Sequence, residues 1–349
     1  MASGFALRHR TFIELMTTET GASGRRLAEV RARTALRGAG LDPMVELERA
    51  SSVTNEVWLT PTHSVRVNRR PNNRLYREAL VAEVLPPEVG YPKVVAHGGS
   101  PGEDWLVQER VPGQPLAHVW PMLTAEQRQR AVFGLAERLA ALHATPVPAD
   151  LPPIDDAPQL LEGGATDATR RVIAALHEAG RLDHVDPVLF AEARDLVTQL
   201  APTIIPFESE TLVHGDVTFE NVLWHDDEIS ALLDVEWARP GPRDLDLDIL
   251  LRCAAHPQLH VAERFVPQTR VEDYNEVPWW LGQAYPSLFD YPNQIDRVRI
   301  YSIAYDVRDL LVAPPTVAPC HLPELHAYHR LERVVHRKSY IDALGGCRV

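Results

Sequence analysis

Acidic and amide side chains are concentrated in one short stretch of the sequence, residues 212–250. Asp216 is followed five residues later by Asn221, and Asp234 comes after a second apolar run. Phosphoryl transfer needs a carboxylate that accepts the hydroxyl proton, together with an amide and a second carboxylate that hold Mg²⁺ on the phosphates. We therefore predict that Asp216 is catalytic and that Asn221 and Asp234 are metal ligands.

The local sequence also predicts how these side chains come together. The apolar runs at 222–224 and 229–233 are typical of short strands, and the polar residues 225–228 between them are typical of a turn. A β-hairpin formed by these runs places Asp216 before its first strand and Asp234 directly after its second. The polar side chains can then converge at one small element.

The same stretch resembles the motif of a known family. Residues 214–221 read H-G-D-V-T-F-E-N and residues 234–236 read D-V-E, which is similar to the aminoglycoside phosphotransferase and choline kinase superfamily rather than to protein kinases. The family pattern D-W-E-x-A-x-x-G-D-P-x-x-D-L is matched at Asp234, Glu236, Ala238, Gly241, Asp246 and Leu247. The chain departs from it at Val235, which replaces Trp, and at Pro242 and Arg243, which replace Asp-Pro.

The resemblance implies an enzyme that moves the γ-phosphate of ATP, with GTP as an alternative donor, to an alcohol group with the help of Mg²⁺. It also implies an α+β fold of the two-lobe protein-kinase-like type, with a small antiparallel β-sheet and a helix in the N-lobe and a larger, mainly helical C-lobe. We expect a flexible N-terminal extension over residues 1–22, a nucleotide-binding N-lobe over 23–112, and a catalytic, acceptor-binding C-lobe over 113–349. A helical insertion is expected at about 155–201.

The resemblance places a nucleotide loop at residues 50–58, which read ASSVTNEVW. Asn55 matches the family's loop, whereas Ser51 and Ser52 replace its usual glycines. Glycine lets a backbone approach phosphates closely. Serine is small and can donate a hydroxyl hydrogen bond, so we expect this loop to hold the nucleotide more loosely.

A kinase-like site also requires a cation on the third strand, paired with a glutamate of the following helix. Lys93 comes too late in the chain to supply that cation. Arg66, in the strand-like run 64–67, takes its place, and Glu78, in the predicted helix 74–84, is the expected partner. Arginine keeps its charge and offers a planar fork to phosphate.

Other residues are assigned by the resemblance or by local composition. The hinge residues that would bind the adenine edge are Gln108, Glu109 and Val111, followed by the lobe boundary at Pro112 and Gly113. The residues that would support the catalytic loop without taking part in the chemistry are His214, Glu236 and Asp246. Candidates for the acceptor site are Glu220, Trp279, Trp280 and Tyr285. Aromatic rings beside carboxylates can hold a cationic ligand, but such a cluster is more often part of a hydrophobic core.

Charge is unevenly distributed along the chain, whose formal net charge is −13. Residues 1–113 carry 15 basic and 13 acidic side chains, whereas residues 114–349 carry 20 and 35. This asymmetry favours a cationic acceptor at the C-lobe and argues against nucleic acid as a partner. The alternative interpretation is that the excess acid only keeps the protein in solution.

Composition sets further bounds. No run of about 18 apolar residues exists, so a membrane-spanning helix is not predicted. Three widely separated cysteines, at positions 253, 320 and 347, do not form a disulfide framework and are typical of a reducing cytoplasm. We expect a cytoplasmic monomer or homodimer that binds a nucleotide and a small-molecule acceptor.

Two other patterns indicate competing chemistry. Residues 98–102 fit the G-x-S-x-G motif of hydrolases, but Pro101 and Gly102 lead into another strand, which predicts a hairpin turn instead of a nucleophile elbow. Cys253, His256 and His260 could be imagined as zinc ligands, but C-x-x-C pairing is missing.

Three functional hypotheses remain for the acceptor. The first is phosphorylation of an aminoglycoside-like or other antibiotic, in resistance or self-protection. The second is a metabolite kinase for a choline-like, sugar or amino-acid alcohol. The third is a nucleotide-binding pseudokinase, which the intact set of Asp216, Asn221 and Asp234 disfavours.

Overall fold

An antiparallel sheet forms the N-lobe. The structure is a computed structural model, and it describes residues 22–50, 55–69, 71–100, 102–155, 159–207 and 209–344. Five strands pair in the order β1-β2-β3-β5-β4. Their bounds are Glu48–Ala50 (β1), Glu56–Leu59 (β2), His63–Val67 (β3), Val94–Gly98 (β4) and Trp105–Glu109 (β5). Ser51 and Ser52, predicted to be part of the nucleotide loop, lie outside the described residues, as does the expected extension up to residue 21.

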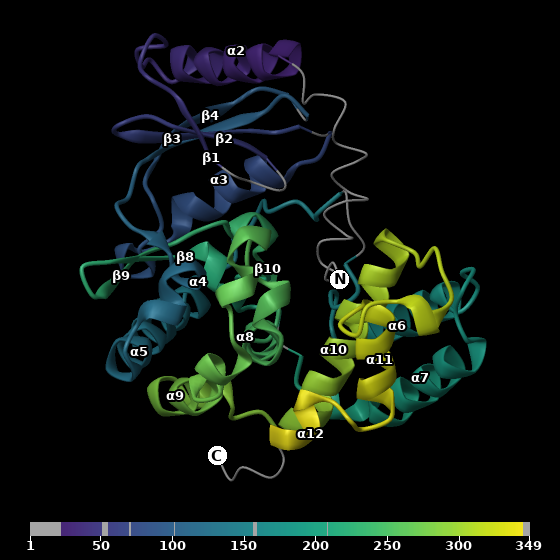
Figure 1. The fold of residues 1–349 in the computed structure, drawn as a ribbon. Helices are drawn as coiled ribbons and strands as arrows, with labels where there is room; N and C mark the ends of the chain where they lie inside the picture. Colours follow the sequence, from purple (N-terminus) through teal and green to yellow (C-terminus); the bar gives the residue numbers. More distant parts are fainter. Residues whose placement is uncertain are drawn as a thin grey trace.

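Alternation along the strands gives this sheet two different faces, each covered by a helix (Figure 1). Val65 is buried against helix α2 (Ala22–Gly38), whereas Leu106 packs with helix α3 (Arg74–Val84). Successive side chains of a strand point to opposite faces. Arg66, which pairs with Leu106 across the sheet, therefore lies on the face that α3 covers.

Helices make up most of the C-lobe, below the sheet in Figure 1. They are α4 (Leu116–Val119), α5 (Ala125–His143), α6 (Ala165–Ala179), α7 (Pro187–Leu200), α8 (Asp244–Ala255), α9 (Val277–Ala284), α10 (Gln294–Val312), α11 (Ala327–Val335) and α12 (Tyr340–Leu344). The helices α6 and α7 fall within the predicted insertion. The two-lobe architecture predicted above is confirmed, and its exact lobe boundaries stay a prediction.

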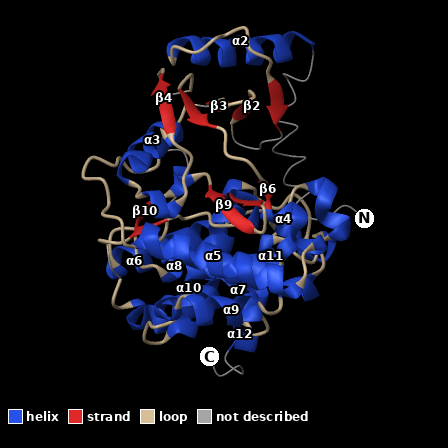
Figure 2. Cartoon of the chain, turned by 90° about the vertical axis from the view of Figure 1, so that its left-hand side faces the viewer, coloured by secondary structure: helices blue, strands red, loops and turns tan. Residues whose placement is uncertain are grey.

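Short strands lie at the junction of the two lobes (Figure 2). Strands β8 (Val222–His225) and β9 (Glu228–Leu232) form the predicted antiparallel hairpin, and β6 (Gln114–Pro115) pairs with β8. A second pair joins β7 (Leu212–Val213) to β10 (Arg239–Pro240). The polar segments before β8 and after β9 thus emerge where the N-lobe and C-lobe meet.

Helix α5 shows how local sequence and packing agree in the C-lobe. Thr124 accepts the backbone N–H of Gln127, whose side chain accepts the N–H of Thr124, and these two reciprocal bonds form a capping box. Apolar residues at helical spacing on α5, including Leu135 and Leu139, are fully buried in the main core. This rigid helix supports β9 and the loops beside it.

Helix α3 fastens the two lobes together. Arg77, which is 2% exposed, donates from Nη2 to the Ala238 carbonyl oxygen at 2.5 Å, and Arg74 donates from Nη1 to Glu236 Oε1 at 3.2 Å. Both acceptors lie in or directly after a single-turn 3-10 helix, η6 (Val235–Trp237), that follows Asp234. The N-lobe helix is therefore held against the segment that carries the predicted metal ligand.

The G-x-S-x-G pattern lies in a hairpin connection, as predicted. Strands β4 and β5 pair antiparallel on either side of it, so no helix follows the serine. Of the described helices, none combines the length and the apolar character needed to cross a bilayer.

Candidate active site

A buried carboxylate at the start of α8 holds the catalytic loop in place. Asp246 accepts the backbone N–H of His214 at 2.7 Å and that of Gly215 at 2.8 Å. Gly215 has φ +80°, and a Cβ atom there would lie 2.5 Å from the Trp237 carbonyl oxygen. Glycine is therefore required by both conformation and space. The loop reaches Asp216 already ordered by backbone contacts.

Burial by itself would raise the pKa of Asp246. Hydrogen bonds from His143 and from the loop N–H groups outweigh that effect and hold the pKa below its usual range. His143 Nε2 lies 3.0 Å from Asp246 Oδ2, and its Nδ1 lies 3.1 Å from the Tyr285 hydroxyl oxygen. A chain of hydrogen bonds thus extends from the catalytic loop into the C-lobe core.

His214 uses both of its ring nitrogens within the loop. Nε2 lies 2.9 Å from the Leu233 carbonyl oxygen, which can only accept, and Nδ1 lies 3.3 Å from the N–H of Asp216, which can only donate. These partners select the neutral tautomer with the proton on Nε2. Burial lowers the pKa of His214 as well. His214 therefore ties the two sides of the hairpin together and has no free nitrogen to act as a base.

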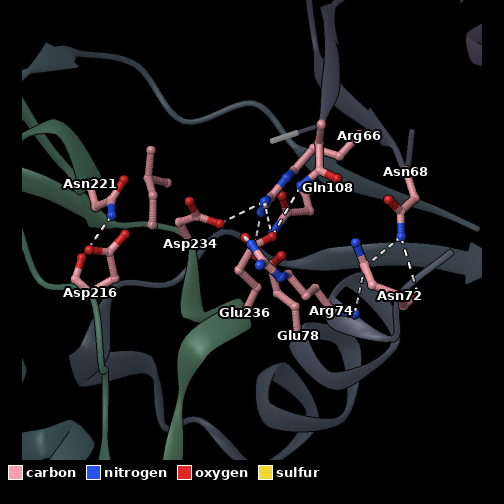
Figure 3. A network of polar contacts seen from close by, with 12 residues as sticks. Arg66, Asn68, Asn72, Arg74, Glu78, Gln108, Asp216, Asn221, Asp234 and Glu236 are labelled. Atoms are coloured by element: carbon pink, nitrogen blue, oxygen red, sulfur yellow. Dashed lines mark hydrogen bonds and ion pairs between the residues drawn. The ribbon is translucent and has the colours of Figure 1, made fainter. Parts of the chain in front are cut away.

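Asp216 and Asn221 lie beside each other (Figure 3). Asn221 Nδ2 donates to the main-chain oxygen of Asp216 at 2.8 Å. Burial raises the pKa of the Asp216 carboxyl to about 7, and the negative charge of Asp234 adds to this against the lowering effect of Arg308 and Arg74. A carboxyl that titrates near neutral pH is suited to accepting and returning a proton.

Asp234 has an unusual backbone conformation between β9 and η6, with φ 63° and ψ 53°. Aspartate is among the few residues other than glycine that tolerate this left-handed region. The conformation turns the chain directly after the strand. Asp234 Oδ1 lies 2.6 Å from Arg66 Nη2, so the hairpin meets the N-lobe sheet at this residue.

Arg66 is surrounded by three carboxylates, as Figure 3 shows. Its guanidinium contacts Glu78 through Nη1, and Nη2 lies 3.2 Å from Glu236 Oε2 in addition to Asp234. Burial alone would lower the pKa of Arg66, but these three charges raise it well above its ordinary value. The predicted pairing of Arg66 with Glu78 is confirmed, and the participation of Asp234 and Glu236 was not predicted.

Gln108 does not point its side chain outward from the predicted hinge. Its Nε2 donates to the Tyr91 hydroxyl oxygen at 2.8 Å, and Tyr91 donates in turn to Glu78 Oε1 at 2.6 Å. Gln108 is 5% exposed and lies in a strand paired on both sides. Its contacts therefore orient Glu78, and Glu109 and Val111 stay the predicted hinge residues.

Glu236 is the second anchor of the network and is 1% exposed. It accepts from Asn55 Nδ2 at 3.1 Å and from Arg74 at 3.2 Å, besides Arg66. Arg74 also stacks over the Trp237 ring, 4.0 Å from its centroid. Burial raises the pKa of both Glu78 and Glu236, and the negative charge of Asp234 raises it further, against the lowering effect of Arg66. Sequence patterns did not identify Tyr91, Arg74 or Trp237 as parts of the site.

The donor set decides where Mg²⁺ would fit. Within the described residues, Glu78, Asp234 and Glu236 are the one group of three or more potential metal-binding side chains whose ligand atoms lie within 4.8 Å of one another. The Arg66 guanidinium already fills the space between them. Asn221 and Asp234 instead offer hard oxygen atoms, which suit Mg²⁺, and the Asn221 amide nitrogen is the atom that faces Asp216 (Figure 3). Cys253, His256 and His260, considered above for zinc, do not form such a group within the described residues.

The four acceptor candidates have different surroundings. Glu220 Oε1 is held by His118 Nε2 at 3.0 Å and by the N–H of Ala262 at 2.7 Å. Tyr285 is 9% exposed and its hydroxyl contacts His143. Trp280 packs against the main core, whereas Trp279 is 50% exposed. These contacts favour the core interpretation for Tyr285 and Trp280, and a role in acceptor binding stays a prediction for all four.

The Arg66 network generates a stability prediction. Replacing Arg66 with Met leaves three carboxylates together without their central cation. Removal of one partner from a buried ion pair typically costs about 3 to 5 kcal/mol, and we expect a loss of that size in the free energy of unfolding, measured by urea denaturation. Lys93→Met is the control, because Lys93 is 75% exposed and pairs with Glu109 at 3.2 Å on the same sheet. Equal effects of the two changes would contradict the proposed network.

Asp246 generates a second prediction, on pH. The pKa of Asp246 is lowered in the folded state, so its contribution to stability is present above the unfolded pKa and is lost as pH falls. Asp246→Asn should lower the free energy of unfolding by about 2 to 3 kcal/mol at pH 7, and the difference from wild type should shrink below about pH 4. Asp226→Asn, at a carboxylate 88% exposed in the hairpin turn, is the matched control. A difference that does not change with pH would contradict this account.

Comparisons with known proteins identify the family of this chain. Residues 47–279 match the model of the phosphotransferase enzyme family, APH. An aminoglycoside 3'-phosphotransferase of Streptomyces fradiae is 30% identical over 203 residues, which cover 57% of this chain and 64% of that protein, slightly less than two thirds of its length.

Solved structures resemble this fold at low sequence identity. A thermostable mutant of the aminoglycoside phosphotransferase APH(4)-Ia, in a ternary complex with ADP and hygromycin B, has a TM-score of 0.58 at 15% identity; the match covers 87% of this chain and 97% of that chain. A choline/ethanolamine kinase family protein from Mesorhizobium loti has a TM-score of 0.58 at 15% identity. The match covers 91% of this chain and 98% of that chain. These similarities confirm the predicted kinase-like fold, and the family match over residues 47–279 shows that the chain belongs to the phosphotransferase enzyme family.

Proposed function

We propose that this chain is a small-molecule O-phosphotransferase that moves the γ-phosphate of ATP to an alcohol group. The observation that carries the proposal is the convergence of Asp216, Asn221, Asp234 and Arg66 at the junction of the lobes. Two carboxylates, an amide and an arginine are the side chains that phosphoryl transfer requires for proton acceptance, metal binding and charge neutralisation. Family membership supports the same reaction class.

In the proposed mechanism the acceptor hydroxyl donates its proton to the Asp216 carboxylate. The hydroxyl oxygen forms a bond to the γ-phosphorus as the bond from that phosphorus to the bridging oxygen breaks, and ADP leaves. Asp216 is suited to this role because its pKa is raised to about 7, near the range in which general bases work well. His214 positions the loop in this mechanism and transfers no proton.

Asn221 and Asp234 are the proposed ligands of Mg²⁺, which when bound would neutralise phosphate charge. Arg66 is proposed to bind phosphate oxygens through its planar fork. To do so it must exchange part of its contact with Asp234, whose Oδ1 lies 2.6 Å away. Glu78 and Glu236 would keep the guanidinium in place during that exchange.

The acceptor has two candidate classes. An antibiotic is supported by the similarity to the Streptomyces fradiae aminoglycoside 3'-phosphotransferase and to the structure that contains hygromycin B. A metabolite alcohol is supported by the similarity to a choline/ethanolamine kinase family protein. A pseudokinase role is disfavoured because the complete set of polar side chains is retained.

Asp216→Asn tests the proposed function. General base catalysis contributes about 10² to 10⁴ in rate, so we expect a loss of that size in kcat for ADP formation, followed in a coupled assay. The affinity for ATP, measured by calorimetry, should change by less than about threefold. Asp226→Asn is the control for a nearby exposed carboxylate. Turnover by Asp216→Asn within a few-fold of wild type would contradict the catalytic assignment.

A further inference from the structure

A recess of about 40 Å³ opens beside the catalytic loop, at Gly215. Its lining combines apolar and aromatic side chains such as Leu161 and Tyr305 with two arginines, Arg239 and Arg308. Gly215 directly precedes Asp216, so a molecule seated in this recess lies next to the proposed base. The charge of the lining therefore bears on the acceptor.

Arg239 reaches the loop from β10 without a carboxylate partner. A Cβ atom built on Gly215 would lie 2.5 Å from Arg239 Nη1, so the guanidinium is directly against the loop. Nη1 donates to the Trp237 carbonyl oxygen at 3.4 Å, and the buried Nε has no hydrogen-bond partner. Across the described residues, no carboxylate oxygen lies within 4.0 Å of Arg239. Glu162, the carboxylate with the largest electrostatic effect on Arg239, lies 3.6 Å from Arg171.

Arg308 approaches the recess from α10. Its guanidinium carbon lies 4.6 Å from the centroid of Tyr305 and 5.6 Å from that of Trp237. The carboxylate contact recorded for it is to Asp309, at the limiting distance of 4.0 Å. Asp309 is itself paired with Arg330 at 2.8 Å. The Arg308 guanidinium is thus only weakly paired, and its side chain is 26% exposed, so it can bind an anion.

Among the described residues, one acidic side chain lines the recess, and it has other partners. Asp248 is 3% exposed, accepts from the Tyr340 hydroxyl at 3.3 Å and lies 3.9 Å from Arg252. It forms no ion pair with either Arg239 or Arg308 within the described part of the chain. The recess is therefore positively charged although residues 114–349 carry a large acidic excess.

A larger cavity of about 260 Å³, farther along α8 and α10, is also lined by more basic than acidic side chains. Its charged lining residues are Arg252, Arg330, Arg333, Lys338, Asp306 and Glu324. Arg252 and Arg330 both contact Asp306, at 2.9 and 2.7 Å. The acidic excess of the C-lobe thus does not line either cavity, and total charge is a poor guide to the acceptor.

We infer that the acceptor carries an anionic oxygen group, a carboxylate or a phosphate, which Arg239 and Arg308 bind while its hydroxyl group faces Asp216. The inference rests on the proposed function, because it names the acceptor class of the same site. Two arginines without strong internal partners match an oxyanion, with which a guanidinium fork makes two parallel hydrogen bonds. The same pair of charges disfavours a polycationic aminoglycoside.

Acceptor screening by charge class tests this inference. ADP formation from Mg²⁺–ATP is measured with hydroxy carboxylates, phosphorylated alcohols, neutral sugars and hydroxy amides, amino alcohols and aminoglycosides. We expect the highest kcat/KM in one of the two anionic classes, and the comparison of these two separates a carboxylate site from a phosphate site. A best acceptor that is neutral or cationic, or no acceleration by any anionic compound, would overturn the inference.

Variants of the two arginines separate acceptor binding from a structural role. Arg239→Gln and Arg308→Gln should each raise the KM of the best anionic acceptor about tenfold or more, the equivalent of one charge-assisted hydrogen bond. The preference for that acceptor over its neutral amide should fall in both variants. Arg239→Lys and Arg308→Lys, which keep the positive charge, should each retain part of that preference. Calorimetric binding of the anionic acceptor without nucleotide should weaken in parallel.

Arg170→Gln is the control, because Arg170 is 71% exposed on α6 and pairs with Asp167 at 2.8 Å. An unchanged preference in both Arg239→Gln and Arg308→Gln would overturn the inference while the proposed function stands. Absence of ADP formation with every acceptor class and with water, in a folded protein, would instead contradict the proposed function itself.

Discussion

The contact between the Arg66 guanidinium and three carboxylates is the constraint on which the rest of the site depends. Glu78 comes from α3, and Asp234 and Glu236 come from the segment after the hairpin, so one side chain of the sheet joins both lobes. Glu78 and Glu236 are fully buried, and neither charge is tolerable alone, because an uncompensated ion in a protein interior costs several kcal/mol. The same contacts therefore stabilise the junction of the lobes and fix the position of the proposed phosphate-binding group, Arg66.

Burial has opposite consequences for two aspartates of the same loop region. The pKa of Asp216 is raised because burial and Asp234 are opposed by few hydrogen bonds, whereas the pKa of Asp246 is lowered because two backbone N–H groups and His143 bind its ionised form. Environment thus separates a carboxyl that can exchange a proton from one that stays charged and holds the loop. The difference follows from the partners that α5 and the loop at residues 214–215 supply to Asp246.

Much of this site was predictable from local sequence, because the hairpin, Asp216, Asn221 and Asp234 lie within a few residues of one another and at regular strand ends. Arg66 was predictable by elimination, since no lysine is available. The partners Tyr91, Arg74 and Trp237 could not be predicted, because they reach the site from separate elements and no sequence pattern marks them as part of it. Overall charge also favoured a cationic acceptor, whereas the recess that Arg239 and Arg308 line contains a single described carboxylate, Asp248.

The most direct test of the central claim is a crystal structure of the chain with Mg²⁺ and a non-hydrolysable ATP analogue. The account predicts that oxygen atoms of Asn221 and Asp234 bind the metal ion and that Arg66 contacts phosphate oxygens while Glu78 and Glu236 hold it. A nucleotide bound elsewhere, with the contact of 2.6 Å between Arg66 and Asp234 retained, would contradict it.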